Sequence, residues 1–334
     1  MIAAAPSSLV DPQGRTVDYL RISITDRCNE RCLYCLPEQF QGWLPREEVL
    51  GYDELLEVAR AAHELGFRRF RVTGGEPLIR PGVADFVADL AALPGAEVAL
   101  TTNGTRLAAL APLLAQAGLR SVNVSLDALD AERYHAITNG DVRQVFAGLD
   151  AARAAGIPIK LNTVLIRHRN EDQLVPILDF AAEHGYPVRF IELMPVSLTE
   201  MLSEENFLPI AEVRRFLEKV DELDPIEAAP ELESRRGPAR YFRLRRRGSV
   251  VGFIGALTEE HFCGRCNKMR ITCDGKLRPC LGNHLEQDLK PGLRPAFDRA
   301  LLRDLFTRTL AEKPAEHIFL NNYQPDRVMT AIGG

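Results

Sequence analysis

The sequence lacks a long hydrophobic run, a secretory leader and an excess of basic residues. No stretch of about 18 apolar residues occurs, which argues against a transmembrane helix. Residues 1–15 show no charged segment followed by an apolar one, so we expect no signal peptide. The net charge is −5 over 334 residues, which argues against a general nucleic-acid-binding protein. We therefore expect a cytoplasmic protein that binds neither a membrane nor a nucleic acid.

The chain has seven cysteines, but their spacing does not indicate disulfide bonds. Cys28, Cys32 and Cys35 lie in one short loop with the spacing Cys-x3-Cys-x2-Cys. Three thiolates leave one iron of a cubane iron–sulfur cluster without a protein ligand, and that iron can bind a cofactor or a substrate. Ferredoxin loops have a different spacing and a fourth cysteine nearby, and structural zinc usually has four closed ligands. The loop therefore predicts chemistry at an open cluster, in a compartment that keeps thiols reduced.

A second set, Cys263, Cys266 and Cys280, has the spacing Cys-x2-Cys-x13-Cys if Cys273 is a bystander. Zinc is an alternative for this set, and unliganded core thiols are an alternative for both sets. The segment between Cys263 and Cys280 is also basic, with one acid, Asp274. A local basic pocket of this kind suits an anionic small molecule in an acidic protein, although a solvated basic face is the simpler interpretation. The basic residues are Arg265, Lys268, Arg270, Lys276 and Arg278.

Strand-like and helix-like segments alternate through the first two thirds of the chain. The predicted strands are Tyr19–Thr25, Phe70–Thr73, Val98–Thr101, Ser121–Leu126, Ile157–Leu165 and Val188–Leu193. The predicted helices are Tyr52–Leu65, Val83–Leu93, Thr105–Ala117, Arg143–Ala155 and Asp172–His184. This order fits a doubly wound sheet or an incomplete barrel. Candidate site residues follow most of the strands at their carboxyl ends, which favours an α/β fold of the barrel type.

The alternation of strand-like and helix-like segments stops after about residue 221. We predict a hairpin from Arg240–Arg246 and Ser249–Ile254, then the second cysteine set, then a helical stretch over Pro295–Thr309. The predicted domains are therefore residues 1–220, a partial barrel, and residues 221–334, an extension that closes the barrel and carries the second cysteine set. Such an extension would bring the two sets face to face across one cavity.

Several motifs together resemble one family. The loop at residues 28–35 resembles the signature of radical S-adenosylmethionine (SAM) enzymes. Within that superfamily the chain is similar to the MoaA family, the GTP 3′,8-cyclases that open molybdenum-cofactor biosynthesis, from about residue 15 to 334. The other matching segments are residues 20–29, 73–78, 101–104, 123–127 and 189–195, the second cysteine set and Gly333-Gly334.

The resemblance implies an incomplete (βα)6 TIM-type barrel and two [4Fe–4S] clusters. The open iron of the first cluster would bind SAM, and that of the second would bind guanine. By motif match the SAM contacts would be Tyr34, Gly75, Ser125 and Met194. The GTP contacts would be Arg21, Arg71, Thr102, Lys160, Arg189, Lys268 and Arg270. Lys268 departs from the family, which usually has Arg there, and Lys cannot give the same planar two-point contact.

The implied activity is radical SAM conversion of GTP to (8S)-3′,8-cyclo-7,8-dihydroguanosine 5′-triphosphate, by hydrogen removal at C3′ and bond formation to C8. It implies an external one-electron reductant and a downstream partner, MoaC, the cyclic pyranopterin monophosphate synthase. No side chain is assigned as a catalytic acid, base or nucleophile, and the oligomeric state is open, with a homodimer as one candidate. A peptide-modifying radical SAM enzyme and a non-catalytic metal-binding module are the alternatives.

Overall fold

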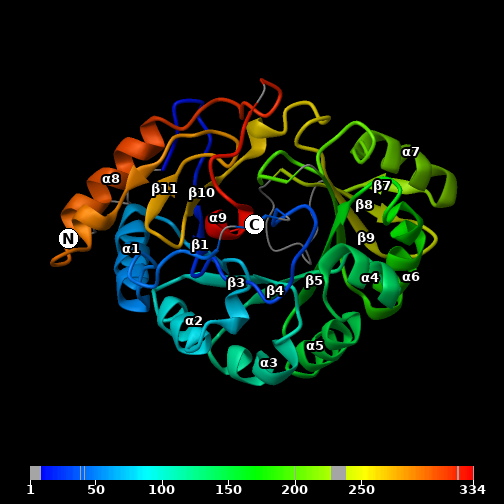
Figure 1. Cartoon of the computed structure of the whole chain (residues 1–334), viewed down its shortest axis with the longest axis horizontal. Helices are drawn as coiled ribbons and strands as arrows, with labels where there is room; N and C mark the ends of the chain where they lie inside the picture. The colour runs from blue at the N-terminus through cyan, green and yellow to red at the C-terminus, as the bar shows by residue number, and fades with distance from the viewer. Residues whose placement is uncertain are drawn as a thin grey trace.

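The computed structural model describes residues 9–37, 39–40, 42–199, 201–226, 238–321 and 323–333. The predicted tail residue Gly334 lies outside the described residues. In the described parts of the chain the strands form one curved sheet of twelve, and helices lie around its outer side (Figure 1). No helix of these parts is long and apolar enough to cross a membrane.

Six parallel strands alternate with helices, as the sequence predicts. The strands are β1 (Tyr19–Ser23), β2 (Arg69–Thr73), β3 (Glu97–Thr102), β4 (Ser121–Ser125), β5 (Ile159–Leu165) and β6 (Val188–Glu192). The helices are α1 (Tyr52–Leu65), α2 (Val83–Ala91), α3 (Leu107–Gln116), α4 (Ala131–Thr138), α5 (Val142–Ala154) and α6 (Leu174–His184). The short helix α4 was not predicted. Glycine follows several of these helices with positive φ, as at Gly66 (115°) and Gly185 (70°), where a left-handed residue ends the helix.

Alternation along each strand separates the core from the interior of the curve. On β1, Leu20 and Ile22 are fully buried in the main hydrophobic cluster, whereas Arg21 between them lines the interior cavity. The same alternation holds on β2, where Phe70 and Val72 pack in the core on either side of Arg71. Because successive strand residues point to opposite faces, the apolar residues meet the helices and the polar residues are left to face one another inside.

The C-terminal part of the chain extends both edges of this sheet. Strand β9 pairs parallel with β6, and β10 pairs parallel with β1. Antiparallel strands continue outward from each, so the order is β12-β11-β10-β1-β2-β3-β4-β5-β6-β9-β8-β7. The elements are α7 (Ile210–Val220), β7 (Leu223–Pro225), β8 (Arg240–Leu244), β9 (Val250–Ile254), β10 (Lys268–Ile271), β11 (Lys276–Arg278), β12 (Gln287–Asp288), α8 (Arg299–Ala311) and α9 (Met329–Ile332).

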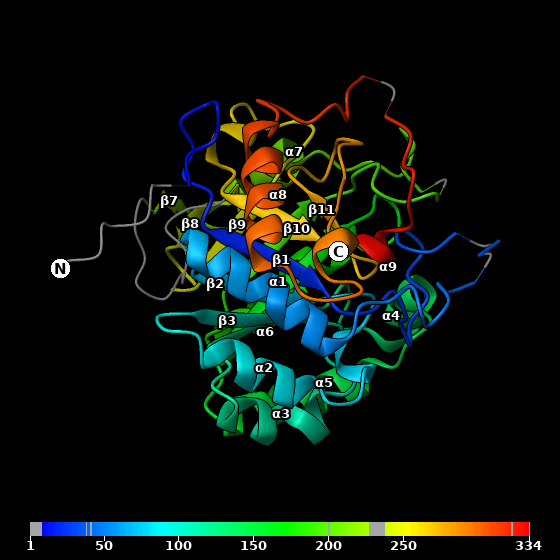
Figure 2. The same cartoon turned by 90° about the vertical axis from the view of Figure 1, so that its left-hand side faces the viewer.

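The structure contains the predicted hairpin as β8 and β9, and α8 begins four residues later than the predicted helical stretch. Strands β10 to β12 were not predicted. The extension therefore shares the sheet of the barrel, and the division of the chain at residue 220 stays a prediction. Figure 2 shows α8 beside α1, where Arg299 lies 2.7 Å from Glu57 and fixes the extension to the first helix.

Candidate functional site

One cavity of about 360 Å³ lies within the curve of the sheet. Every residue that the sequence analysis assigned to a cluster, to SAM or to GTP lines this cavity. They come from six strands, from the loop after β1 and from the extension. The two cysteine sets line the same space.

The first cysteine loop follows β1 and folds as a tight turn. The amide of Cys35 donates to the carbonyl of Cys32 (2.9 Å), and the amide of Arg31 donates to the carbonyl of Thr138 at the end of α4 (2.8 Å). The amide of Glu30 lies 3.4 Å from the sulfur of Cys28. Burial, followed by the charge of Cys35, raises the pKa of Cys32, and burial, followed by the charge of Cys28, raises the pKa of Cys35 to about 12. The turn thus brings three sulfurs together at the end of one strand.

The glycine pair after β2 packs against this loop. A Cβ on Gly75 would come within 2.4 Å of the carbonyl oxygen of Arg27, and one on Gly74 within 2.6 Å of that of Thr25. The amide of Gly75 donates to Thr25 (2.7 Å), and that of Glu76 donates to Arg27 (2.8 Å). The glycines are therefore needed to seat the residues immediately before Cys28, which adds to the predicted role in approaching a ligand.

Buried carboxyl groups surround the first loop. Glu76 accepts from the hydroxyl of Thr102 (2.7 Å) and from the amide of Asn103 (2.7 Å), so it joins the ends of β2 and β3. Burial raises the pKa of Glu76 to about 7. Because the Thr102 hydroxyl already donates to Glu76, its assignment as a GTP contact stays a prediction that would use the remaining acceptor capacity of the oxygen.

Two further carboxyl groups lie close by. Asp127 accepts from the hydroxyl of Tyr34 (2.7 Å), and Glu30 accepts from that of Tyr134 (2.9 Å). Burial raises the pKa of Asp127 to about 6 and that of Glu30 to about 8. Tyr34, predicted to contact SAM, is thus fixed at its phenolic end.

Cationic side chains occupy the opposite part of the cavity at matched positions of neighbouring strands. Arg21 on β1 is in register with Arg71 on β2 and with Arg270 on β10. Arg189 on β6 lies opposite Gly252 on β9, where a Cβ would come within 3.0 Å of the Arg189 Cγ. The register of the sheet therefore collects the four guanidinium groups on one surface, and Gly252 leaves room for one of them.

Asparagines position these arginines. The Nε of Arg189 donates to Asn162 Oδ1 at 2.8 Å. Oriented to satisfy both neighbours, the amide oxygen of Asn123 accepts from Arg71 Nη1 (2.8 Å) and Arg189 Nη2 (2.5 Å). The sequence analysis did not assign either asparagine, although alternation on β4 places Asn123 on the same face as Ser125, which was assigned.

Crowding of buried cations has an electrostatic cost. Burial, followed by the charge of Arg270, lowers the pKa of Arg21 to about 9. Burial, together with the charges of Arg21 and Arg189, lowers the pKa of Lys268 to about 7. An anion placed among these groups would relieve both their mutual repulsion and their loss of hydration. The arrangement suits a polyanionic ligand such as a triphosphate.

Backbone amides favour the thiolate form of each cysteine of the second set. The amides of His317, Lys268 and Gly282 act to lower the pKa values of Cys263, Cys266 and Cys280, respectively, against the effect of burial. All-sulfur donor sets with hydrogen bonds to the sulfurs are typical of iron–sulfur sites. In the described residues no three His, Cys, Asp or Glu side chains converge on one ion, but the ligands of a cluster each bind a different iron. Both cysteine sets therefore fit a cluster with one open iron.

Comparisons with known proteins agree with this site. The Radical SAM superfamily matches residues 22–181, and Molybdenum Cofactor Synthesis C matches residues 186–319. A GTP 3′,8-cyclase of Moorella thermoacetica is 44% identical over 97% of this chain and 99% of its own. One of Pseudomonas entomophila is 44% identical over 98% of this chain and 99% of its own. The chain belongs to the GTP 3′,8-cyclase family of radical SAM enzymes.

Solved structures share the fold. SuiB of Streptococcus suis bound to S-adenosylmethionine is 16% identical, with a TM-score of 0.61, and the match covers 93% of this chain and 77% of SuiB. SuiB bound to the precursor peptide SuiA gives 0.62 at 16% identity, covering 93% of this chain and 75% of SuiB. At that identity the likeness concerns the fold alone. Membership of the radical SAM superfamily carries the use of SAM and of an iron–sulfur cluster.

The C-terminal tail reaches the cavity, where Met329 and Thr330 belong to the lining. The carbonyl of Gly333 accepts from Arg21 Nη2 (3.3 Å) and from Arg270 Nη1 (3.2 Å), and α9 lies at the centre of Figure 1. A Cβ on Gly333 would come within 2.7 Å of the Thr73 side chain. Gly333 is therefore required by space as well as by its positive φ of 74°.

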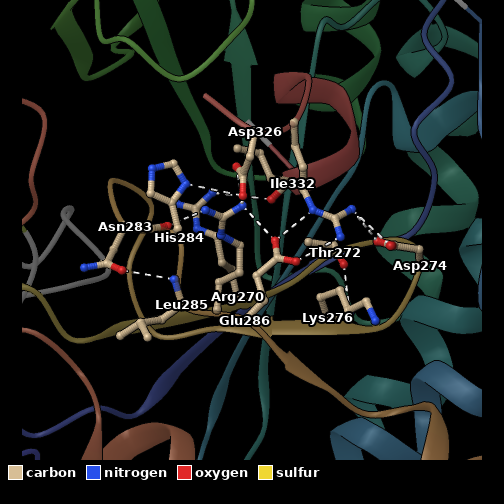
Figure 3. A network of polar contacts seen from close by, with 12 residues as sticks. Arg270, Thr272, Asp274, Lys276, Asn283, His284, Leu285, Glu286, Asp326 and Ile332 are labelled. Carbon is tan, nitrogen blue, oxygen red and sulfur yellow. Dashed lines mark hydrogen bonds and ion pairs between the residues drawn. The ribbon is translucent and has the colours of Figure 1, made fainter. Parts of the chain in front are cut away.

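A network of ion pairs fixes the start of this tail to the second cysteine segment (Figure 3). Arg327 lies 3.0 Å from Asp274 and 2.8 Å from Glu286. Arg278, whose side chain is fully buried, lies 2.9 Å from Glu286 and 3.4 Å from Asp326. The network joins β11, the following loop and the tail, so the position of the tail depends on the same segment that carries Cys280.

Residues near the cysteines that were not assigned as ligands lie elsewhere. Cys273 is fully buried in the protein interior and is not among the residues that line the cavity. His284 stacks on Tyr323 and lies 3.4 Å from Asp326 (Figure 3). His261 has a positive φ of 59° and is likewise absent from the cavity lining.

Proposed function

We propose that the protein converts GTP to (8S)-3′,8-cyclo-7,8-dihydroguanosine 5′-triphosphate, the first step of molybdenum-cofactor biosynthesis. The observation that carries this proposal is a single cavity lined by two open cysteine triads and a set of arginines and lysines, in a chain 44% identical over its length to named GTP 3′,8-cyclases. A site with one triad would support the superfamily only.

We assign the two ends of the cavity to different ligands. Cys28, Cys32 and Cys35 would hold a [4Fe–4S] cluster with SAM, which when bound supplies the one-electron chemistry that removes hydrogen from C3′ of GTP. Cys263, Cys266 and Cys280 would hold the second [4Fe–4S] cluster, whose open iron orients guanine. The SAM contacts would be Tyr34, Gly75, Ser125 and Met194.

The chain's own contribution is positioning and charge neutralisation. Arg guanidinium groups give bidentate contacts to phosphate oxygens, and the matched register of Arg21, Arg71 and Arg270 presents such groups side by side. Holding the ribose between the two clusters would place C3′ near SAM and C8 within reach of C3′, which is the entropic part of catalysis. The proposed GTP contacts are Arg21, Arg71, Thr102, Lys160, Arg189, Lys268 and Arg270.

The proposal extends to partners and location. Six reduced thiols require a reducing compartment, for which we propose the cytoplasm. A one-electron donor and the downstream synthase MoaC complete the expected partners, and a homodimer is one proposed assembly.

The test is anaerobic turnover with SAM, a strong reductant and GTP deuterated at C3′, followed by mass measurement of the 5′-deoxyadenosine. Deuterium in 5′-deoxyadenosine is expected, and it would establish the substrate and the reacting position together. Unlabelled 5′-deoxyadenosine would reject C3′ of GTP as the reacting position. No 5′-deoxyadenosine from protein with full iron and sulfide would reject the enzyme assignment, and peptide modification without GTP would favour the peptide-modifying alternative.

A further inference from the structure

Lys313, two residues after α8, is a buried lysine that contacts a cysteine of the second set. Its side chain ends against the sulfur of Cys266, with Nζ 3.7 Å from Sγ. Nζ also donates to the backbone carbonyls of Lys268 (2.9 Å) and Pro279 (2.5 Å). The residue is only 3% exposed.

The three contacts account for all hydrogen-bonding capacity of the side chain. An ammonium group has three N–H donors and no acceptor, and each donor here has one acceptor. A buried charge is costly unless it is fully paired, so this geometry fixes the ammonium group in a single position. Packing alone would be served by a methionine or leucine of similar length, which would require no partners.

The contacts of Lys313 reach both parts of the second cysteine motif. Lys268 follows Cys266 by two residues, and Pro279 immediately precedes Cys280. The next residues of the same segment are held to Cys263, because Arg15 donates to the carbonyls of Pro314 (2.6 Å), Ala315 (2.9 Å) and Cys263 (2.9 Å). The segment 313–315, together with Arg15, thus contacts the surroundings of all three cysteines, and Lys313 is the residue of this segment whose ammonium group contacts a sulfur.

We propose that Lys313 is a positioning residue that sets the reduction potential of the second cluster and strengthens its hold on the guanine of GTP. The inference rests on the proposed function, since it needs a cluster at this site. A cationic N–H donor withdraws electron density from a thiolate, and hydrogen bonds to sulfur are among the levers that set the potential of a cluster. A weaker thiolate donor leaves the open iron more electrophilic toward a nitrogen or oxygen of the base.

The experiment uses the full-length chain with Cys28, Cys32 and Cys35 replaced by alanine, so that the second cluster alone is observed after anaerobic reconstitution. Redox titration followed by electron paramagnetic resonance compares Lys313→Met, Lys313→Gln and Lys313→Arg. Lys313→Met is expected to shift the potential to a more negative value. Lys313→Arg, which keeps the charge, is expected to have a potential close to that of the parent protein. Lys313→Gln keeps N–H donors without the charge, and its potential is expected to lie between those of Lys313→Met and the parent.

A matched control is Lys276→Met. It removes a lysine that lies between Cys263 and Cys280 in sequence and pairs with Asp288 (2.8 Å) rather than with sulfur. It is expected to leave the potential unchanged. In the background with all six cysteines, the dissociation constant for GTP is expected to rise about tenfold in Lys313→Met, the lower end of the loss for partners of metal ligands. If Lys313→Met does not retain iron, the test uses Lys313→Gln instead: a more negative potential would support the role of Lys313, and an unchanged potential would overturn it.

The outcomes separate the two proposals. An unchanged potential and unchanged GTP affinity in a Lys313 variant that holds full iron and sulfide would overturn the role of Lys313 and leave the proposed function intact. A second site that binds zinc without sulfide in the parent protein would overturn both.

Discussion

The two cysteine regions line one cavity but differ in the charged groups that surround them. At the first, burial followed by the charges of Glu76 and Glu30 raises the pKa of Cys28 to about 12. At the second, burial also acts to raise the pKa of Cys266, but the ammonium groups of Lys313 and Lys268 outweigh it and hold the pKa below its ordinary value. Burial raises the pKa of Cys263 and of Cys280, so within the second set the lowered pKa is confined to Cys266, the cysteine that Lys313 contacts.

The difference suits the two functions proposed for the sites, reductive cleavage of SAM at the first and binding of GTP at the second. Burial disfavours additional negative charge, so a low reduction potential is expected at the buried first site, as the reductive cleavage of SAM needs. Nearby positive charge raises the potential and attracts an anionic substrate, which suits a site that binds GTP. Under the proposed function the first site would be the reducing end of the cavity and the second the substrate end, and the predictions below test that assignment.

The largest effect is expected from Cys28→Ala. Loss of one of three ligands should remove the first cluster and reduce SAM cleavage below detection, while the iron of the second site stays bound. The measurement is 5′-deoxyadenosine formed per protein, together with iron content. Cys273→Ala is the matched control, because Cys273 is buried outside the cavity lining. Equal loss of activity in the control would contradict a special role of the loop.

Arg189→Ala should weaken GTP binding by about 10- to 100-fold, which corresponds to losing a charged hydrogen bond worth about 1.5–3 kcal/mol. SAM cleavage without GTP should change little, since Arg189 belongs to the cationic surface. Equilibrium dialysis with GTP gives the affinity. Arg245→Ala, at an exposed arginine paired with Glu222 and Asp224, controls for loss of a cation and should leave the affinity as it is.

Arg327→Gln should release the tail from the second cysteine segment. Two partly buried carboxylates, Asp274 and Glu286, lose their shared partner, at a cost of about 1–2 kcal/mol. Amide hydrogen exchange in residues 328–333 is expected to become about tenfold faster while exchange in β1 to β6 stays the same. Arg308→Gln breaks an exposed pair with Asp304 on α8 and serves as control. Unchanged exchange in the tail would show that α9 docks without the network.

The sequence predicts those strands and helices whose apolar residues recur with a clear period. Strands β1 to β6, the β8–β9 hairpin and six of the helices follow apolar patterns strong enough to be found. Alternation on β1 and β2 is why Arg21 and Arg71 could be placed inside. Strand β10 was missed because Lys268 and Arg270 alternate with only two apolar residues in a segment interpreted as metal-binding. Helix α4 is short and has few apolar residues.

The charged groups around the two cysteine sets were harder to predict than the cysteine sets themselves. Cysteine spacing carries a local signal, but Lys313 lies 47 residues from Cys266 in sequence and belongs to no motif. Glu30 and Asp127 lie within motif segments, yet only the fold shows that both are buried near the first cysteine loop. Contacts of this kind depend on which segments the sheet brings together, and no residue pattern within one segment records them.

Asn123→Ala should have a moderate effect on the substrate end. It removes the acceptor shared by Arg71 and Arg189, so both guanidinium groups lose their fixed orientation, and GTP affinity should fall about fivefold, as expected for about 1 kcal/mol. Asn123→Asp should weaken GTP binding further, because a carboxylate would pair with the arginines and repel the triphosphate. Tighter binding by the Asp variant would contradict the assignment of these arginines to phosphate.

The smallest effect is expected from Lys268→Arg, which restores the residue usual in the family. Burial and the neighbouring cations lower the pKa of Lys268 to about 7, whereas a guanidinium group remains charged and offers a planar two-point contact. Lys268 also lies over the Tyr19 ring, 5.5 Å from its centroid, and an arginine can stack there equally well. GTP affinity should therefore rise about two- to fivefold, roughly half a charged hydrogen bond, without a change in SAM cleavage. A fall in affinity would mean that the cavity fits the compact ammonium group better than the larger guanidinium group, because the residues around Lys268 leave space for a lysine only.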